Sequence, residues 1–161
     1  MQKLNFFGVG PKIARSIFPW LAMTIILTII KKDIFRFTAS DISSVRIAGI
    51  IVLGLGLIFY FLTVPALLKG LKETRLMTKG GFYMCQNPLY ASVILLIIPG
   101  VALLSNSWLI LTTSIIGYIM FRINIHAEYS ELEKVFGEEY HKYKKDTPEF
   151  FPFPVKKLFR R

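Results

Sequence analysis

The stretch Leu89–Phe121, LYASVILLIIPGVALLSNSWLILTTSIIGYIMF, contains 33 residues and not one charged side chain. As a single helix it would be roughly 50 Å long at 1.5 Å per residue, whereas the hydrocarbon core of a bilayer is about 30 Å thick. The polar triplet Ser-Asn-Ser at residues 105–107 interrupts it and offers good N-cap residues. The stretch therefore predicts a helical hairpin, with spans at residues 89–104 and 108–123 and an interfacial Trp108 at the tip.

Two further apolar segments precede this hairpin. The run Ile47–Leu68 has 22 residues without a charge, which is enough for one transmembrane helix. The segment 16–30 is 15 residues long and contains Pro19, so it is either a short span or an interfacial helix. Within the longer run, Gly54 and Gly56 are expected to permit close helix packing. The sequence therefore predicts an all-α integral membrane protein with about four transmembrane helices.

Positive charge is concentrated on one side of this arrangement. The chain has 20 Lys and Arg against 10 Asp and Glu, which gives a net charge of +10. With four spans, 16 of the 20 basic residues lie on one side, in residues 1–15, in the loop after residue 68 and in the segment from Arg122 onward. Cytoplasmic segments of membrane proteins carry the excess of Lys and Arg. We therefore expect the C-terminal segment to be cytoplasmic, in a bacterial-type inner or plasma membrane.

The composition excludes several other classes of protein. Hydrophobic residues make up 53% of the chain, too many for a disordered segment, and the single cysteine, Cys85, excludes a disulfide scaffold. Because the basic residues follow the membrane boundaries, we expect no nucleic-acid partner. His126 and His141 lack carboxylate or cysteine partners at metal-ligand spacing, so we expect no metal site.

The polar segment after the hairpin, residues 126–145, is predicted to be a cytoplasmic amphipathic helix. Its apolar and aromatic side chains recur at steps of three and four residues and therefore share one face; they are Leu132, Val135, Phe136, Tyr140 and Tyr143. Gly137 is either a weak point of this helix or a break between two shorter ones. Residues 146–161 are predicted to form an aromatic and basic tail on the membrane surface.

Two stretches are expected to meet at the same membrane face, because the hairpin returns the chain to the side from which it left. One is the loop GGFYMCQNPLY at residues 80–90, and the other comprises residues 128–152. Together they could form one site.

This arrangement resembles the isoprenylcysteine carboxyl methyltransferase and phospholipid methyltransferase superfamily of small integral membrane proteins. The first motif of that family, Gly-x-Tyr-x-x-x-Arg-His-Pro-x-Tyr, is matched at Gly80, Pro88 and Tyr90. The second has Glu-Glu-x-x-Leu, then Phe-Gly, then Tyr-x-x-Tyr, and its matching residues are Glu128, Leu132, Phe136, Gly137, Tyr140 and Tyr143. The family's tyrosine, arginine, histidine and second glutamate are replaced here by Phe82, Gln86, Asn87 and Tyr129. The resemblance covers residues 80–152.

The resemblance implies an S-adenosylmethionine-dependent methyltransferase with a lipid-like or prenylated acceptor reached from the bilayer. The implied cofactor-binding residues are Tyr83, Gln86, Asn87, Pro88, Tyr90, Glu128 and Tyr140. Glu128 could bind the amine or a ribose hydroxyl of the cofactor, and aromatic rings could enclose its sulfonium cation. No catalytic residue is assigned, because catalysis would rest on positioning and desolvation. A carboxylate acceptor needs no base, and the sequence reveals no obvious base for an amine acceptor.

Simpler interpretations of the same residues stay open. Asn87 and Pro88 fit the N-cap and first-turn proline of a helix, Glu128 fits a solvated helix charge, and Tyr140 and Tyr143 fit packing residues. The departures from the motifs also leave open a catalytically degenerate relative. A non-enzymatic membrane scaffold or transporter subunit is the alternative from another class.

Overall fold

The computed structural model describes residues 8–38 and 41–151 of the chain, and nearly all regular structure in them is helical. In chain order the elements are α1 (Gly10–Ile30), α2 (Lys32–Phe35), α3 (Ile42–Glu73), α4 (Gly81–Met84), α5 (Pro88–Ser92), the π-helical segment η1 (Val93–Ile97), α6 (Ile98–Leu104) and α7 (Trp108–Asp146). The prediction of an all-α fold is therefore confirmed. The greater part of the predicted tail, residues 152–161, lies outside the described residues.

Three helices in the described part of the chain, α1, α3 and α7, are long and apolar enough to cross a membrane. Helix α1 begins at Gly10, ahead of the predicted start at residue 16, and its 21 residues extend for about 30 Å, the thickness of a bilayer core. The fourth apolar run, Pro88–Leu104, is shorter than these helices. A membrane protein of about four spans is consistent with these lengths, and the number four stays a prediction.

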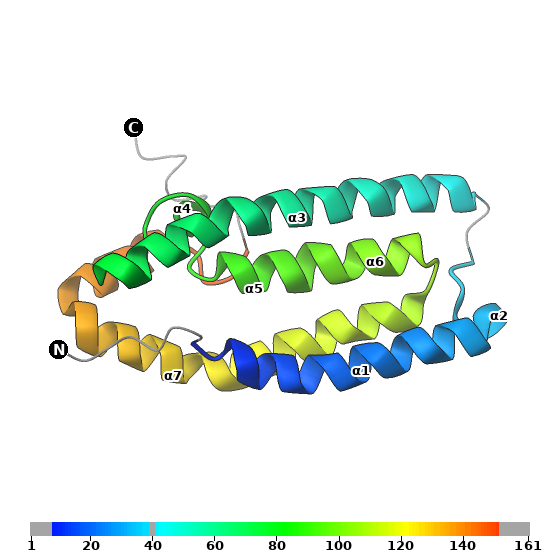
Figure 1. Cartoon of the computed structure of the whole chain (residues 1–161), viewed down its shortest axis with the longest axis horizontal. Coiled ribbons are helices and arrows are strands. Elements are labelled where there is room, and N and C mark those ends of the chain that lie inside the picture. Colours follow the sequence, from blue (N-terminus) through cyan, green and yellow to red (C-terminus); the bar gives the residue numbers. More distant parts are fainter. Residues whose placement is uncertain (1–7, 39–40, 152–161) are drawn as a thin grey trace.

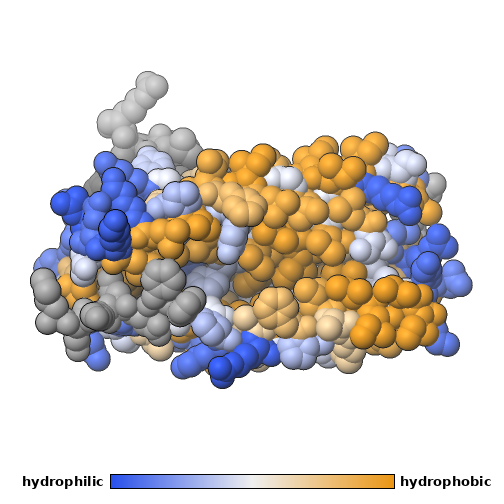
Figure 2. Space-filling model, viewed as in Figure 1, coloured by the Kyte–Doolittle hydropathy of each residue, from blue (hydrophilic) through white to orange (hydrophobic). Residues whose placement is uncertain are grey.

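The surface of the molecule matches a membrane environment. Figure 2 shows hydrophobic residues across the middle of the molecule, with hydrophilic residues gathered mainly toward its two ends. Large apolar side chains such as Ile50, Phe61 and Ile115 are more than half exposed. In water such a surface would be unfavourable, whereas in a bilayer it contacts acyl chains.

The chain runs back and forth along the long axis of the molecule (Figure 1). Helix α1 packs along α7, and α3 packs along η1 and α6. A hydrogen bond from Trp20 Nε1 to Thr112 Oγ1, 3.0 Å long, joins α1 to α7, and such bonds between helices are favourable away from water. Helix α2 and the hairpin turn lie at one end. The α4 loop and the last turns of α7 lie at the other end, so the two stretches singled out in the sequence share it.

Small residues let α3 approach η1 and α6 closely. An added Cβ at Gly100 would lie 2.7 Å from the backbone nitrogen of Leu53, and one at Gly56 would lie 2.8 Å from Leu96 Cβ. Gly54 has nothing within 4 Å of such a Cβ. The predicted packing role is thus confirmed for Gly56 and wrong for Gly54, because one glycine faces the neighbouring helix and the other faces away from it.

The hairpin turn falls at the polar triplet, between the end of α6 at Leu104 and the start of α7 at Trp108. Ser107 occupies the N-cap position of α7 but makes no side-chain capping bond. Its hydroxyl instead shares a 2.8 Å hydrogen bond with the Thr28 hydroxyl on α1. Trp108 is partly exposed at the tip and its indole donates to the Ile34 carbonyl oxygen at 3.3 Å.

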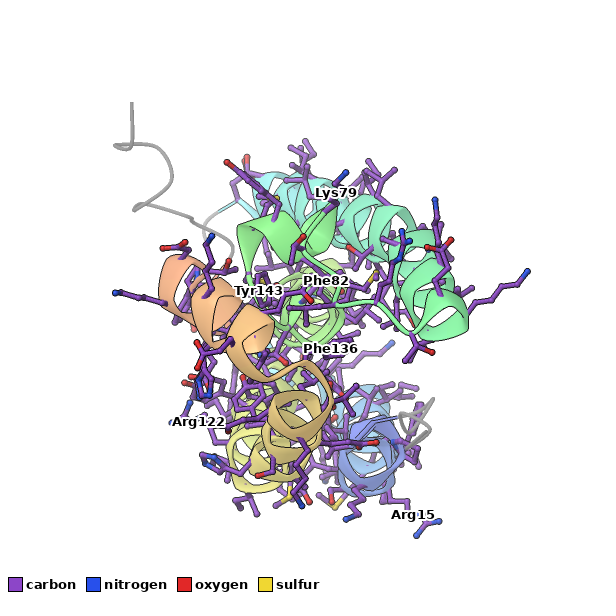
Figure 3. The ribbon with its side chains drawn as sticks, turned by 90° about the vertical axis from the view of Figure 1, so that its left-hand side faces the viewer. Arg15, Lys79, Phe82, Arg122, Phe136 and Tyr143 are labelled. Atoms are coloured by element: carbon purple, nitrogen blue, oxygen red, sulfur yellow. The ribbon has the colours of Figure 1, made fainter. Side chains whose placement is uncertain are left out.

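The helix predicted at residues 126–145 is continuous with the second helix of the hairpin, since α7 extends from Trp108 to Asp146. Gly137, with φ 47° and ψ −122°, breaks it, so of the two interpretations of this glycine the break is confirmed. A positive φ favours glycine because other residues adopt it with strain. The break turns the last part of α7 over the end of the bundle, where Phe136 and Tyr143 lie toward the centre of the view in Figure 3.

One irregularity lies inside the first helix of the hairpin. The π-helical turn η1 immediately precedes α6, which has Pro99 in its first turn. Proline lacks the amide hydrogen of a regular helix, so the backbone must rearrange around it. Such π-turns are rare and often occur at functional sites, and η1 borders the cavity described below.

Candidate functional site

Hydrogen bonds join the loop at residues 80–90 to the C-terminal segment. The Gln86 backbone amide donates to the Pro148 carbonyl oxygen at 2.9 Å, and its side-chain nitrogen donates to the Thr147 carbonyl oxygen at 2.6 Å. The Tyr143 hydroxyl donates to the Phe82 carbonyl oxygen at 2.6 Å. The expectation that these two stretches meet is therefore confirmed.

Asn87 is at the centre of this junction and is 4% exposed. Its side-chain nitrogen donates to the Tyr129 hydroxyl at 2.5 Å and to the Glu149 carbonyl oxygen at 2.8 Å. Asn87 does precede the helix that begins at Pro88, but its side chain makes no capping bond. The prediction of Asn87 as the N-cap residue and Pro88 as the first-turn proline is therefore confirmed in position, but the Asn87 side chain does not cap the helix, because its amide is committed to these two partners.

Tyr129 and Glu149 extend the junction toward the surface. The Tyr129 hydroxyl donates to Glu149 Oε1 at 3.1 Å, and the other carboxylate oxygen of Glu149 forms an ion pair with Arg122. Burial raises the pKa of Tyr129, and the charge of Glu149 raises it further, so its hydroxyl stays protonated and able to donate. Neither Arg122 nor Glu149 was among the predicted site residues, because no periodicity links two residues 27 positions apart.

Glu128 belongs to a separate set of contacts on the same helix. Its Oε2 accepts hydrogen bonds from the Tyr90 hydroxyl at 3.1 Å and from the Val9 backbone amide at 3.2 Å. Burial raises the pKa of the Glu128 carboxyl, while the bonds from Val9 and Tyr90 act in the opposite direction. The interpretation of Glu128 as a solvated helix charge is therefore wrong.

The beginning of α1 covers this carboxylate. Gly8 has φ +50°, and an added Cβ there would lie 2.5 Å from Glu128 Oε2. A side chain at this position would therefore be strained twice, by the backbone angle and by the contact. Residues 8–10 were not among the predicted site residues, and the Gly-Val-Gly-Pro turn at residues 8–11 is the signal that could have suggested them.

A long cavity of about 690 Å³ connects this junction to the apolar interior of the bundle. Five of the seven predicted cofactor-binding residues border it, and all five lie at its polar end: Gln86, Asn87, Pro88, Tyr90 and Glu128. The rest of its wall is mainly apolar. Most of it comes from α1, α3, η1 and the start of α6, with Ile17, Leu21, Val64, Leu67, Ile94 and Ile97 among the lining residues, and α4, α7 and the segment after α3 complete it. We call this space the long cavity.

The other two predicted residues lie elsewhere. Tyr83 on α4 is 50% exposed and does not border the long cavity. Tyr140 is 1% exposed, packs beside the Tyr129 ring, and its hydroxyl has no hydrogen-bond partner among the described residues. Tyr143, the other tyrosine of this face, does border the cavity. A cofactor contact from Tyr83 or Tyr140 stays a prediction.

A second cavity, of about 570 Å³, opens on the other side of the junction. Gln86 borders both cavities, and the Tyr129 and Glu149 side chains line the second one. Four side chains of its wall carry basic nitrogen groups: Arg122, His126, Lys144 and Lys145. We call this space the basic cavity.

Cys85 is fully buried next to the junction. Burial raises the pKa of its thiol to about 12, so the thiol is protonated at neutral pH and is not a nucleophile. His141 pairs with Glu133 at 3.0 Å on the exposed side of α7. Among residues 8–38 and 41–151, no group of three metal-ligating side chains could hold a metal ion.

The comparisons with known proteins give no match: no family model, no curated protein and no solved structure is similar to this chain.

Proposed function

We propose that this chain is an integral membrane S-adenosylmethionine-dependent methyltransferase that acts on a lipid-like or prenylated acceptor. The observation that carries the proposal is the long cavity, in which a polar end at Asn87, Tyr90 and Glu128 is continuous with an apolar corridor between α1 and α3. Such a cavity suits a water-soluble donor and a membrane-soluble acceptor that react together. Its volume lies within the range of about 300–1,000 Å³ typical of small-molecule sites.

The chemistry of the polar end fits this cofactor. S-adenosylmethionine carries an ammonium group and a sulfonium cation, which need acceptors and ring faces. The Glu128 carboxylate borders the cavity, and the buried side-chain oxygen of Gln86 has no hydrogen-bond partner among the described residues. Phe82, Tyr90 and Phe136 add aromatic surface to the same wall. When bound, the cofactor supplies a methyl group on a positively charged sulfur that is its own leaving group.

The residues around Glu128 hold it in one orientation. Tyr90 and the Val9 amide both donate to Oε2, so the carboxylate cannot rotate without losing a bond. We assign Glu128 to the amine or a ribose hydroxyl of the cofactor. Asn87 is held by Tyr129 and Glu149, so it presents a fixed edge to the cavity. Preorganisation of this kind lowers the cost of binding.

The apolar corridor would hold the acceptor's acyl or prenyl chain, with the reacting group at the polar end. A carboxylate acceptor needs no base there. An amine acceptor must lose a proton, and we assign no residue to that step, because Glu128 is assigned to the cofactor. We expect the reaction at the cytoplasmic face of a bacterial-type inner or plasma membrane, where the positive-inside rule puts the basic end of the molecule.

Transfer of labelled methyl groups tests the proposal and identifies the acceptor. The full chain in lipid nanodiscs is incubated with methyl-labelled S-adenosylmethionine and either a membrane-lipid extract or a prenylcysteine analogue. We expect label in one of the two organic fractions. Glu128→Ala should lower the rate of methyl transfer at least tenfold. Glu138→Ala should leave this rate unchanged, because Glu138 is exposed and borders neither cavity. Cofactor binding without transfer to any lipid fraction would instead favour the catalytically degenerate alternative.

A further inference from the structure

The basic cavity is not used by the proposed reaction. The residues that line it come from the middle and the last turn of α7, from the segment just after that helix and, with Gln86, from the loop before the hairpin. Arg122, Lys144 and Lys145 outnumber the two acidic side chains of the same wall, Asp146 and Glu149. The cavity therefore favours a negatively charged ligand.

The cavity adjoins the end of the uncharged, membrane-length run of the hairpin. Arg122 is the first charged residue after the uncharged run Leu89–Phe121. On the same helix Ile115, Ile119 and Ile123 are 62%, 47% and 64% exposed, and steps of four residues put them on one face. This apolar face leads directly to Arg122, so acyl chains on the helix would bring a phosphate to the cavity.

The basic side chains of the cavity have capacity for a phosphate. Arg122 forms an ion pair with Glu149, and a guanidinium has five N–H donors in a planar fork that matches phosphate oxygens. The Lys144 ammonium is held 5.4 Å from the centre of the Tyr129 ring and 5.9 Å from that of Tyr140. These cation–π contacts keep its charge beside the cavity wall.

We propose that the basic cavity binds the phosphate of an anionic phospholipid headgroup, with the acyl chains along Ile115, Ile119 and Ile123. A zwitterionic headgroup suits it less well, because it would bring its own cation beside Arg122 and the two lysines. Soluble phosphate shares the phosphate chemistry but has no chains for the isoleucine face. The proposal is independent of methyl transfer.

Glu149 sets the strength of this site. It neutralises part of Arg122, and its other oxygen accepts from Tyr129, which in turn accepts from Asn87 at the polar end of the long cavity. A phosphate at Arg122 competes with Glu149 for the guanidinium. Occupation of the basic cavity is thereby linked to the junction that separates the two cavities.

Lipid titration of the full chain in detergent, followed by native mass spectrometry, tests the proposal. The probes are phosphatidylglycerol and phosphatidylcholine of matched chain length, each alone and with inorganic phosphate. We expect the protein to bind phosphatidylglycerol more tightly than phosphatidylcholine. Arg122→Gln should lower the affinity for phosphatidylglycerol roughly fivefold, the usual effect of one basic residue near an anionic surface. The matched control is Arg15→Gln, since Arg15 is exposed, borders neither cavity and lies on another side of this end of the molecule (Figure 3).

A second variant should raise the affinity for phosphatidylglycerol, so the proposal stays testable even if Arg122→Gln fails to fold. Glu149→Gln keeps an acceptor for Tyr129 but removes the competing charge, so it should bind phosphatidylglycerol more tightly than the wild type. Equal binding of the two lipids, or an equal loss with Arg15→Gln and Arg122→Gln, would overturn the site. Binding of inorganic phosphate as tight as that of phosphatidylglycerol would overturn the lipid as its source.

Discussion

The Asn87 amide donates a 2.5 Å hydrogen bond to the Tyr129 hydroxyl across 42 residues of sequence. Both residues stand at positions where the sequence departs from the methyltransferase motif that it resembles. The two residues that differ from the motif, Asn87 and Tyr129, therefore contact each other, and each is a hydrogen-bond partner of the other. This contact ties the loop before the hairpin to α7 and closes the polar end of the long cavity.

Removal of the Tyr129 hydroxyl should destabilise the protein. Tyr129→Phe deprives Asn87 of an acceptor and Glu149 of a donor in a buried place, which costs about 1–3 kcal/mol. Tyr118→Phe is the matched control, because Tyr118 is partly exposed and takes part in ring contacts, which phenylalanine keeps. Thermal unfolding in detergent measures both variants. An equal effect of the two substitutions would show that the Tyr129 hydroxyl contributes nothing specific.

Alanine at two glycines should have opposite effects. At Gly8, with φ +50° and Glu128 Oε2 2.5 Å from the added Cβ, alanine should lower stability by about 1 kcal/mol or more and weaken cofactor binding. At Gly54, inside α3 with nothing within 4 Å, alanine should raise stability by about 0.5–1 kcal/mol. Unfolding temperatures of both variants check this pair, and a destabilised Gly54→Ala or an unchanged Gly8→Ala would contradict it.

The stability of the protein should depend on pH through Glu128. Burial raises its native pKa above the ordinary value of 4.5, so the native state holds the proton more tightly than the unfolded chain does. The stability that Glu128 contributes is therefore full below 4.5 and is lost as the pH rises through its raised native pKa. Glu128→Gln cannot titrate, so it should become more stable relative to the wild type as the pH rises from 4 to neutrality. Unfolding curves of the two proteins across this range measure the difference, and a constant or reversed difference would refute the assignment.

Cys85 should resist alkylation in the folded protein. Its thiol is fully buried, and a pKa raised from 9.0 to about 12 lowers the thiolate fraction about a thousandfold at pH 8. Because Cys85 is the single cysteine of the chain, iodoacetamide labelling followed by mass spectrometry reports on this residue alone. Labelling should become fast only in denaturant. Rapid labelling under native conditions would mean that the junction around Cys85 is open.

The main lines of the fold follow from the sequence because charge and apolar character are sharply separated along it. The hairpin turn was predictable since the polar triplet at residues 105–107 interrupts an uncharged run. The start of α1 at Gly10 was not predictable, because Lys12 and Arg15 limit the uncharged run to residues from 16 onward. A helix can nevertheless include such residues, since long basic side chains lie along it and reach the membrane surface. Hydropathy gives the apolar part of a helix, and its ends depend on contacts.

The site was only partly predictable for a similar reason. The hairpin topology brings Asn87 and Glu128 to one end, and this can be derived from the order of the spans. The contact of Glu128 with Val9 spans 119 residues, and Glu149 lies in the non-helical segment after α7. No periodicity connects such segments, since tertiary packing alone brings them together.

Calorimetric titration of S-adenosylmethionine into the purified full chain tests the central claim most directly. We expect saturable binding with a dissociation constant below 1 mM, on the order of typical enzyme–substrate affinities. Glu128→Ala and Tyr90→Ala should each weaken binding at least tenfold, while Glu138→Ala should match the wild type. Absence of binding at millimolar cofactor, or equal binding by all four proteins, would contradict a cofactor site at the polar end of the long cavity.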